Sequence, residues 1–230
     1  MPDRFYIEEP LAPGPCAITG PEAHHLAQVL RIKPGQHITL FNGNGHEYTA
    51  TIESVRKQQI DVHIDVDRPV SRERECHLTV ACPLPKGDRA QFLIEKLTEL
   101  GVAAYLPLET QRSVVHPGEG KMEKLLRYVI EASKQCGRNV LMSIEPLQKW
   151  EKLVQEVNVE HRFLADASGH SLAMPLQHSR QAFLALGPEG GWTPEELALA
   201  QEHRWNCISL GPSILRIETA ALAAATLLLQ

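Results

Sequence analysis

The sequence predicts an α/β protein in two parts, a small β domain followed by a larger domain built on a parallel sheet. Three observations predict this fold class. Strand patterns dominate residues 4–70, a polar and charge-rich segment follows at residues 69–75, and apolar runs then alternate with helical patterns. Two glycine-containing loops each follow a short apolar run, as loops at the carboxyl ends of parallel strands do. We therefore expect domains at residues 1–72 and 73–230.

The first domain carries mostly strand patterns. Residues 37–41 and 47–55 flank the turn-rich segment 42–45, an arrangement typical of a hairpin. Residues 60–66 alternate strictly between apolar and polar side chains, which predicts a half-buried strand. Residues 21–31 predict one short helix. We expect a small barrel-like β domain.

The second domain repeats strand and helix patterns, which implies a parallel sheet covered on both faces. The expected strands are residues 78–82, 103–108, 143–144, 162–165, 182–186 and 207–210. The expected helices are residues 88–100, closed by Gly101, then 121–135, 147–157, one beginning after Thr193, and 220–229.

The first glycine loop spans residues 187–197 and leads from a strand into a helix. Thr193, Pro194 and Glu196 form a helix start, with a hydroxyl cap, a proline at the first helical position and a capping-box glutamate. Three glycines before this start would let the backbone approach a ligand closely. A plain turn is the alternative. The loop is neither a Walker A motif nor a dinucleotide fingerprint.

The second loop spans residues 210–220 and leads into an alanine- and leucine-rich helix. That helix is apolar on every side, which indicates burial in the core or against a partner subunit. Arg216 and Glu218 stand at its amino end. Taken alone, they are more simply a helix-dipole partner and its salt-bridge mate. Gly211-Pro212-Ser213 lacks the closing glycine of a nucleophile elbow, so a serine hydrolase is not expected.

Composition and charge narrow the possible classes. The 230 residues have a net charge of −5, and their five cysteines form no CxxC pair. No signal for secretion or membrane insertion is present, so a cytoplasmic protein is expected. The eleven histidines show no HExxH or zinc-knuckle spacing, so no metal is expected. Only residues 76–140 are basic, with 9 Lys and Arg against 7 Asp and Glu, and RNA would bind near them.

Together the two loops resemble those of SPOUT-superfamily RNA methyltransferases, specifically the ribosomal RNA small subunit methyltransferase E family. The resemblance covers nearly the whole chain. Further motifs that carry it are Arg4-Phe5-Tyr6, His24-His25-Leu26, Lys86-Gly87-Asp88, Glu99-Leu100-Gly101, Arg112-Ser113 and Gln135-Cys136-Gly137-Arg138.

This resemblance implies a PUA-like RNA-binding first domain and a SPOUT second domain with a trefoil knot. The knot would form the site for S-adenosyl-L-methionine. The cofactor-binding residues that it implies are Leu164, Leu186, Gly187, Pro188, Glu189, Gly190, Gly191, Leu210, Gly211, Ile214, Leu215 and Thr219.

The resemblance also implies an enzyme that methylates N3 of the uridine at position 1498 of 16S ribosomal RNA, in the small ribosomal subunit. Arg216 would stabilise negative charge on the uracil, and Glu218 would act as the base or orient Arg216. The implied RNA contacts are Arg4, Arg31, Lys86, Arg112 and Arg138. We expect a cytoplasmic homodimer that acts in rRNA processing and ribosome biogenesis.

Two residues depart from the family pattern. Ser213 stands where an arginine is usual, and Met142 where a proline is common. Two alternatives therefore stay open, a methyltransferase of the same fold acting on another RNA, and a catalytically silent module for RNA binding or ribosome assembly.

Overall fold

The computed structural model of the chain describes residues 3–114, 118–171 and 180–230. Its internal contacts divide the chain into two compact units. The first comprises Met1–Glu73 and Ser133–Leu141, and the second comprises Arg74–Ala132 and Met142–Gln230. A segment from the middle of the chain therefore completes the first unit, which no local pattern indicates.

The first unit is built on a five-stranded sheet with the order β1-β3-β4-β5-β2. Its strands are β1 (Arg4–Tyr6), β2 (Gly14–Thr19), β3 (His37–Phe41), β4 (His46–Val55) and β5 (Gln59–Pro69). The predicted alternation in β5 is confirmed, because Ile60, Val62 and Ile64 are buried in the core of this unit. The small β domain is thus present, with β1 parallel to β3 and the other neighbours antiparallel.

The helix expected at residues 21–31 is wrong in its form and its end. α1 covers Gly20–His24, and the chain continues as a π-helix over His25–Val29. Arg31 then takes a φ of 52°, in the left-handed region that a helix cannot contain. Helical periodicity does not distinguish these two forms, since they differ by one residue in their hydrogen-bond spacing.

The second unit is built on a parallel sheet with the order β12-β10-β11-β6-β7-β8, and β9 pairs with β7 beside it. Every recorded pair in it is parallel, as the alternation of strands and helices predicts. The strands are β6 (His77–Cys82), β7 (Ala104–Glu109), β8 (Ser143–Ile144), β9 (Gln148–Lys149), β10 (His161–Ser171), β11 (Gln181–Leu186) and β12 (Asn206–Ser209).

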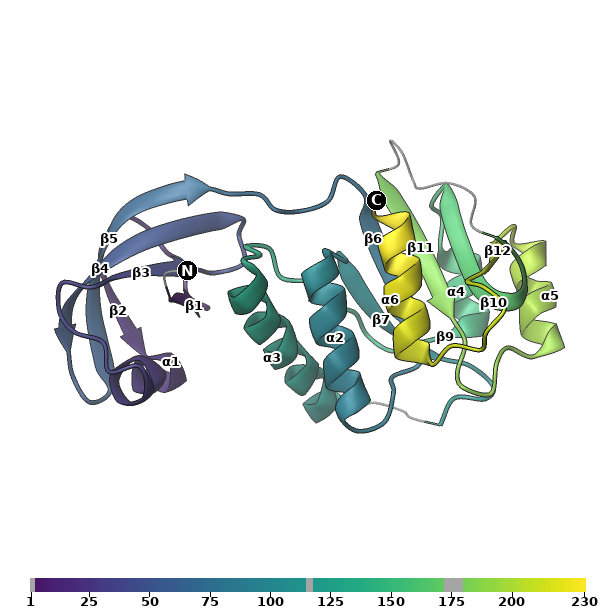
Figure 1. The fold of residues 1–230 in the computed structure, drawn as a ribbon, viewed down its shortest axis with the longest axis horizontal. Coiled ribbons are helices and arrows are strands. Elements are labelled where there is room, and N and C mark those ends of the chain that lie inside the picture. The colour runs from purple at the N-terminus through teal and green to yellow at the C-terminus, as the bar shows by residue number, and fades with distance from the viewer. Residues whose placement is uncertain (1–2, 115–117, 172–179) are drawn as a thin grey trace. The chain divides into compact units, whose positions relative to one another are not determined.

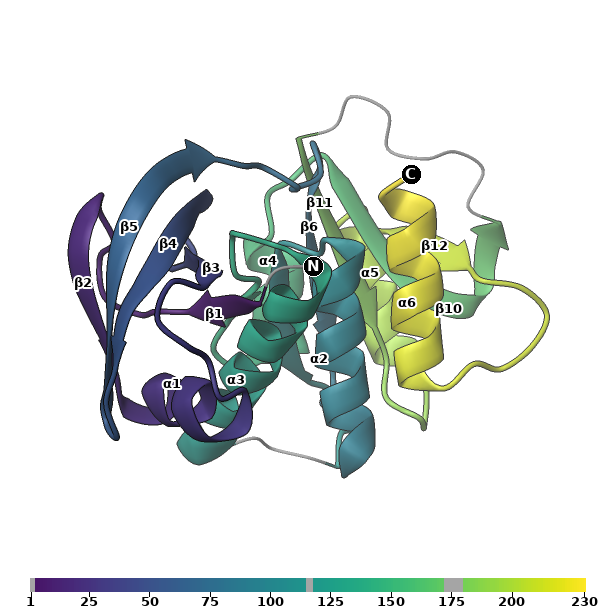
Figure 2. The same cartoon turned by 60° about the vertical axis from the view of Figure 1, so that its left-hand side comes forward.

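Helices cover both faces of this sheet. They are α2 (Asp88–Leu100), α3 (Glu119–Cys136), α4 (Trp150–Glu156), α5 (Pro194–Glu202) and α6 (Ile217–Leu228). α2 and α6 lie side by side on one face, and α4 and α5 on the other (Figure 1, Figure 2). The start expected for α4 at residue 147 is wrong, because residues 148–149 pair with β7 as a strand. Among the described residues, no helix has the length and apolar character needed to cross a membrane.

Three tryptophans fasten α4, α5 and the first glycine loop to the sheet. The Trp150 ring lies 4.7 Å from that of Trp192 and 5.1 Å from that of Trp205, measured between ring centroids. The Trp150 indole also donates a hydrogen bond of 3.3 Å to the carbonyl of Glu196. Such tilted and edge-to-face aromatic contacts stabilise a core beyond the area that they bury. The cluster fixes the position of Trp192, and with it the end of the glycine loop.

The strand β10 is longer than the four residues expected. Its pairing with β12 shifts register between Ala165 and His170, and both residues pair with Ile208. A Cβ on Gly169 would lie 2.5 Å from the carbonyl carbon of Ile208, so only glycine fits there. The chain between Ala165 and Gly169 therefore bulges out of the sheet beside the carboxyl end of β12.

Candidate functional site

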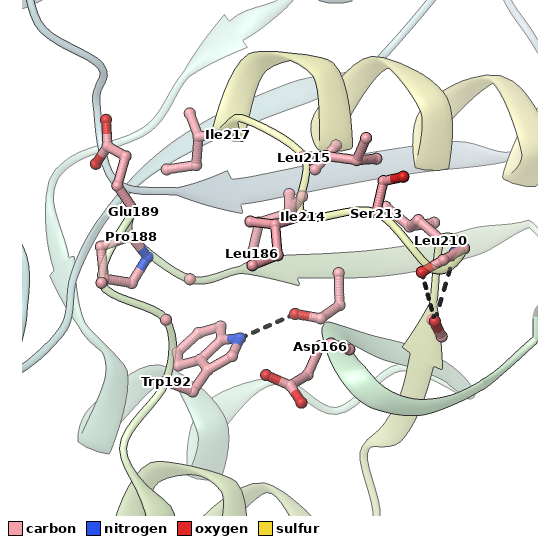
Figure 3. A pocket seen from close by; sticks show the side chains of 18 residues that line it. Asp166, Leu186, Pro188, Glu189, Trp192, Leu210, Ser213, Ile214, Leu215 and Ile217 are labelled. Carbon is pink, nitrogen blue, oxygen red and sulfur yellow. Dashed lines mark hydrogen bonds between the residues drawn. The ribbon is translucent and has the colours of Figure 1, made fainter.

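A cavity of about 340 Å³ opens at the carboxyl ends of β11 and β12, beside the bulge within β10. Parallel α/β sheets bind ligands at this edge, and the volume is within the usual range for a small-molecule site. Its walls are the bulge within β10 and the two glycine loops, which the structure brings together from separate parts of the chain (Figure 3). The lining is mostly apolar side chains and glycine backbone.

The first glycine loop is held by a complete capping box. The Thr193 hydroxyl accepts a hydrogen bond of 3.2 Å from the Glu196 N–H, and the Glu196 carboxylate accepts one of 2.8 Å from the Thr193 N–H. This confirms the predicted helix start. The other Glu196 oxygen accepts a bond of 2.9 Å from the Gln111 N–H. Glu196 is only 2% exposed, so one buried carboxylate ties this loop to the chain after β7.

Trp192 closes one side of the cavity. Its indole N–H donates a hydrogen bond of 3.0 Å to the carbonyl of Ala165, which joins the glycine loop to β10 where its bulge begins (Figure 3). A Cβ on Gly187 would lie 3.0 Å from the same indole nitrogen, which is closer than most Cβ atoms approach a neighbouring side chain. Gly187 thus lets the loop pass tightly over Trp192, and Gly191 supplies a φ of 69° four residues later in the turn.

The second glycine loop carries the most exposed apolar side chain of the site. Ile214 lines the cavity and is 96% exposed. Gly211 has a φ of 119°, which favours glycine, and the Ser209 hydroxyl makes hydrogen bonds of 3.4 Å with the backbone of Gly211. A solvent-exposed apolar side chain on a cavity rim, such as Ile214, is suited to cover an apolar part of a ligand.

The structure brings together ten of the twelve residues expected to bind the cofactor. On the cavity lining it places Leu186, Gly187, Pro188, Glu189, Gly190, Gly191, Leu210, Gly211, Ile214 and Leu215. Leu164 lies instead in the core below the cavity and is 1% exposed. Thr219 is an exposed residue in the first turn of α6, outside the lining.

Sequence reasoning missed eight further lining residues, which are Ala165, Asp166, Ala167, Trp192, Ser209, Ser213, Ile217 and Ala220. The strand-end rule could have found Asp166, since it follows the expected strand 162–165 directly. One Asp166 oxygen accepts hydrogen bonds from the Ser168 N–H at 2.9 Å and the Ser168 hydroxyl at 2.6 Å.

Burial raises the pKa of the Cys207 thiol, and the charge of Asp166 raises it further.

The two residues expected to be catalytic lie at the start of α6 in different surroundings. Arg216 is exposed and caps the helix with extended backbone. Glu218 is 6% exposed, and its nearest recorded cation is Arg89, 3.8 Å away. The structure records no ion pair between Glu218 and Arg216 among the residues it describes.

The residues expected to contact RNA divide into buried and exposed ones. In the first unit, Arg4 bonds to Glu47 and, at 2.7 Å, to the Asn139 side chain, and Arg138 is paired with Glu73. Arg4 and Arg138 therefore stabilise this unit, whereas Arg31 is exposed.

In the second unit, Lys86 is exposed. The guanidinium of Arg112 donates a hydrogen bond of 2.6 Å to the Gly190 carbonyl, so this side chain supports the first glycine loop. Nothing in the sequence distinguishes such structural arginines from arginines that bind RNA. In the ranges 3–114, 118–171 and 180–230, His, Cys, Asp and Glu side chains form no group of three or more that could hold a metal ion.

Comparison with known proteins identifies the family. Residues 72–229 match a model described as an RNA methyltransferase domain, and residues 18–65 match one described as an RNA methyltransferase PUA domain. The ribosomal RNA small subunit methyltransferase E of Bacillus subtilis is 30% identical over 96% of this chain and 93% of its own length. The enzyme of the same name from Synechocystis is 32% identical over 90% of this chain and 70% of its own length.

Solved structures agree with these relatives. A methyltransferase of Legionella pneumophila, solved with bound S-adenosylmethionine, matches with a TM-score of 0.92 and 33% identity over 98% of this chain and 96% of its own. The ribosomal RNA small subunit methyltransferase E of Neisseria gonorrhoeae, also bound to S-adenosylmethionine, matches with a TM-score of 0.88 and 30% identity over 98% and 95% of the two chains. The chain belongs to the ribosomal RNA small subunit methyltransferase E family.

Proposed function

We propose that the protein transfers the methyl group of S-adenosylmethionine to N3 of the uridine at position 1498 of 16S ribosomal RNA. The observation that carries this proposal is the cavity where both glycine loops meet the bulge within β10. Relatives that align over 98% of this chain were solved with S-adenosylmethionine bound. The substrate position follows from the family resemblance and is the finer part of the proposal.

The lining suits this cofactor. Apolar side chains such as Leu186 and Leu215 can pack on the adenine and thioether parts, and the glycine backbones offer N–H and C=O groups for its polar edges. Asp166 supplies a carboxylate acceptor for the donors of the cofactor, and one of its oxygens is already oriented by Ser168. The cofactor supplies a methyl group on a sulfonium, which is a strong electrophile.

The protein must then position the uridine and manage one proton. Uracil N3 becomes nucleophilic as its hydrogen leaves, and negative charge develops on the two flanking carbonyl oxygens. Arg216 is exposed at the start of α6, where its guanidinium can stabilise that charge. Glu218 takes the N3 proton as general base or orients the groups around it. Because N3 lies on the pairing edge, the uridine must be unstacked first.

The proposal includes a trefoil knot and a homodimer. The close backbone approach of Gly169 to Ile208 supports a chain crossing near the cavity, and an experimental structure traced through residues 161–217 would test it.

The apolar helix α6, with Leu227 40% exposed, suits a twofold interface. Light scattering of the purified protein would show a monomer if this is wrong. We propose a cytoplasmic role in rRNA processing and ribosome biogenesis.

Labelled methyl transfer to small ribosomal subunits from cells lacking this gene tests the function. We expect incorporation into 16S ribosomal RNA, with 3-methyluridine identified by mass spectrometry of the nucleosides. Transfer RNA and free 16S RNA serve as parallel substrates. A different methylated nucleoside, or incorporation into transfer RNA alone, would favour an enzyme of the same fold acting on another RNA. Cofactor binding without any product would favour a silent binding module.

Ser213 permits a second test of the site. It lines the cavity where the family usually has arginine, so this chain lacks one cation there. Activity on small subunits would show that serine is tolerated. If Ser213→Arg raises kcat/KM for the RNA without changing cofactor affinity, the missing cation normally contacts the RNA.

A further inference from the structure

Arg89 lies between two carboxylates that belong to different parts of the site. Its guanidinium nitrogen Nη1 is 3.3 Å from Oε1 of Glu189 and 3.8 Å from Oε2 of Glu218. Arg89 stands in the first turn of α2, Glu189 in the first glycine loop and Glu218 in the first turn of α6. One cation therefore connects three segments around the cavity.

Glu218 is a buried carboxylate with incomplete hydrogen bonding, so a nearby cation matters for its stability. Its side chain is 9% exposed, and its Oε2 atom is buried without a hydrogen bond in the part of the chain that the structure describes. A buried carboxylate oxygen without a partner is costly, because it has given up its bonds to water. The amino end of α6 offsets part of this cost through its helix dipole. Arg89 is the cation placed to offset the rest.

Glu218 is the buried member of this group, whereas the side chains of Arg89 and Glu189 are 36% and 51% exposed. Cys82, at the end of β6, is fully buried, and burial raises the pKa of its thiol to about 12. The charges of Glu218 and Glu189 also raise the pKa of Cys82, so both carboxylates lie close to the same buried group. Two carboxylates near one strand end repel each other, and a cation that stands between them reduces this repulsion.

We propose that Arg89 is a positioning residue that couples the cofactor loop, at Glu189, to the reacting end of α6, at Glu218. This inference rests on the proposed function of the site. Both distances exceed the roughly 2.7–2.9 Å of a tight charge-assisted hydrogen bond, so Arg89 is shared between the carboxylates. Arg89 therefore acts within the site, rather than as part of the basic surface that meets RNA.

Substitution of Arg89 separates these roles. We expect Arg89→Ala to lower kcat for methyl transfer about 10- to 100-fold at saturating RNA, because Glu218 loses its orientation. Arg89→Lys should retain part of the activity, and added guanidinium ion should partly restore Arg89→Ala. Arg127→Ala, which removes an exposed arginine of α3 in the same unit, is the matched control. Circular dichroism of each variant confirms that it is folded.

A double-mutant cycle on cofactor affinity tests the coupling between Arg89 and Glu189 without RNA. Calorimetry would compare Arg89→Ala, Glu189→Gln and the double variant. If Arg89 and Glu189 are coupled, the loss of cofactor affinity in the double variant should be smaller than the product of the two single-variant losses. We expect the difference to be at least about threefold. Additive effects would overturn the coupling. A raised KM for RNA with unchanged kcat and cofactor affinity would show that Arg89 contacts RNA instead, and would also overturn it.

The outcomes distinguish this inference from the proposed function. If the wild-type protein forms no 3-methyluridine, the proposed function fails, and the calorimetric cycle still decides whether Arg89 is coupled to Glu189. If the wild-type protein is active and Arg89→Ala has the same kcat, the positioning role is wrong while the function stands.

Discussion

Arg216 and Glu218 are two residues apart, yet one is exposed and the other is buried. The difference follows from helix geometry, because Arg216 caps α6 in extended conformation while Glu218 is already in its first turn. Arg216 can therefore meet a substrate that arrives from solution, whereas Glu218 can act only on a group that enters the cavity edge. Their division of labour in the proposed reaction reflects these positions.

We expect Arg216→Ala to lower kcat about 10²-fold or more, because it removes the cation that we propose stabilises the uracil oxygens. Cofactor affinity should change little, since Arg216 is outside the cavity lining. Single-turnover methyl transfer and calorimetry measure the two effects separately. Arg216→Lys keeps the charge and should be intermediate, and full activity of Arg216→Ala would remove Arg216 from the mechanism.

At the scale of elements, the first glycine loop is fixed by contacts to three other segments. Trp192 binds the Ala165 carbonyl of β10, Arg112 binds the Gly190 carbonyl, and Glu196 binds the chain at Gln111. The capping box alone would hold only the start of α5. The additional contact to Gln111 means that one buried carboxylate joins two loops near the cavity.

Glu196→Ala should therefore destabilise the second unit by about 2–3 kcal/mol, because it removes a helix cap and leaves the Gln111 N–H without its acceptor. All three tryptophans of the chain lie in this unit, so urea unfolding followed by tryptophan fluorescence reports on it. Glu195→Ala, an exposed neighbour in the same turn, is the control and should change stability by less than about 0.5 kcal/mol. Equal effects of the two substitutions would show that the contact to Gln111 contributes nothing.

At the scale of the whole molecule, charged pairs join distant segments within the first unit. Glu47 accepts hydrogen bonds from both Arg4 and Arg72, which are 43 and 25 residues away in sequence. Burial alone would raise the pKa of the Glu47 carboxyl, but the hydrogen bonds from Arg72 and Arg4 outweigh it and lower that pKa from its ordinary value of 4.5. The unit therefore depends on an ionised Glu47.

The ion pairs of Glu47 with Arg4 and Arg72 predict how the stability of the first unit responds to acid. A carboxyl whose pKa is lowered by folding contributes stability that is fully present above its unfolded pKa, near 4.5, and is lost as the pH falls through the lower folded value. Glu47→Gln should cost about 2 kcal/mol at pH 7. The difference from wild type should shrink below pH 4.5.

Thermal unfolding of the first unit at pH 7 and at pH 3, followed by the NMR signals of Tyr6 and Tyr48, measures this effect. Glu53→Gln, at an exposed position of β4, is the control. A pH-independent difference between wild type and Glu47→Gln would contradict an ionic role for Glu47.

Local patterns were sufficient to predict the parallel sheet and the capping box, and the family resemblance implied ten lining residues of the cavity. The sheet and the capping box depend on neighbours a few residues apart or on where a strand ends, which apolar periodicity and the residues at the helix start record directly. Arg4 and Arg138 were expected to contact RNA but lie buried in ion pairs, and Leu164 was expected at the cavity but lies in the core. Arg89, in the basic segment 76–140, lies between Glu189 and Glu218. These roles were decided by contacts between segments tens of residues apart, because burial and the nearest opposite charge depend on packing, which no local pattern contains.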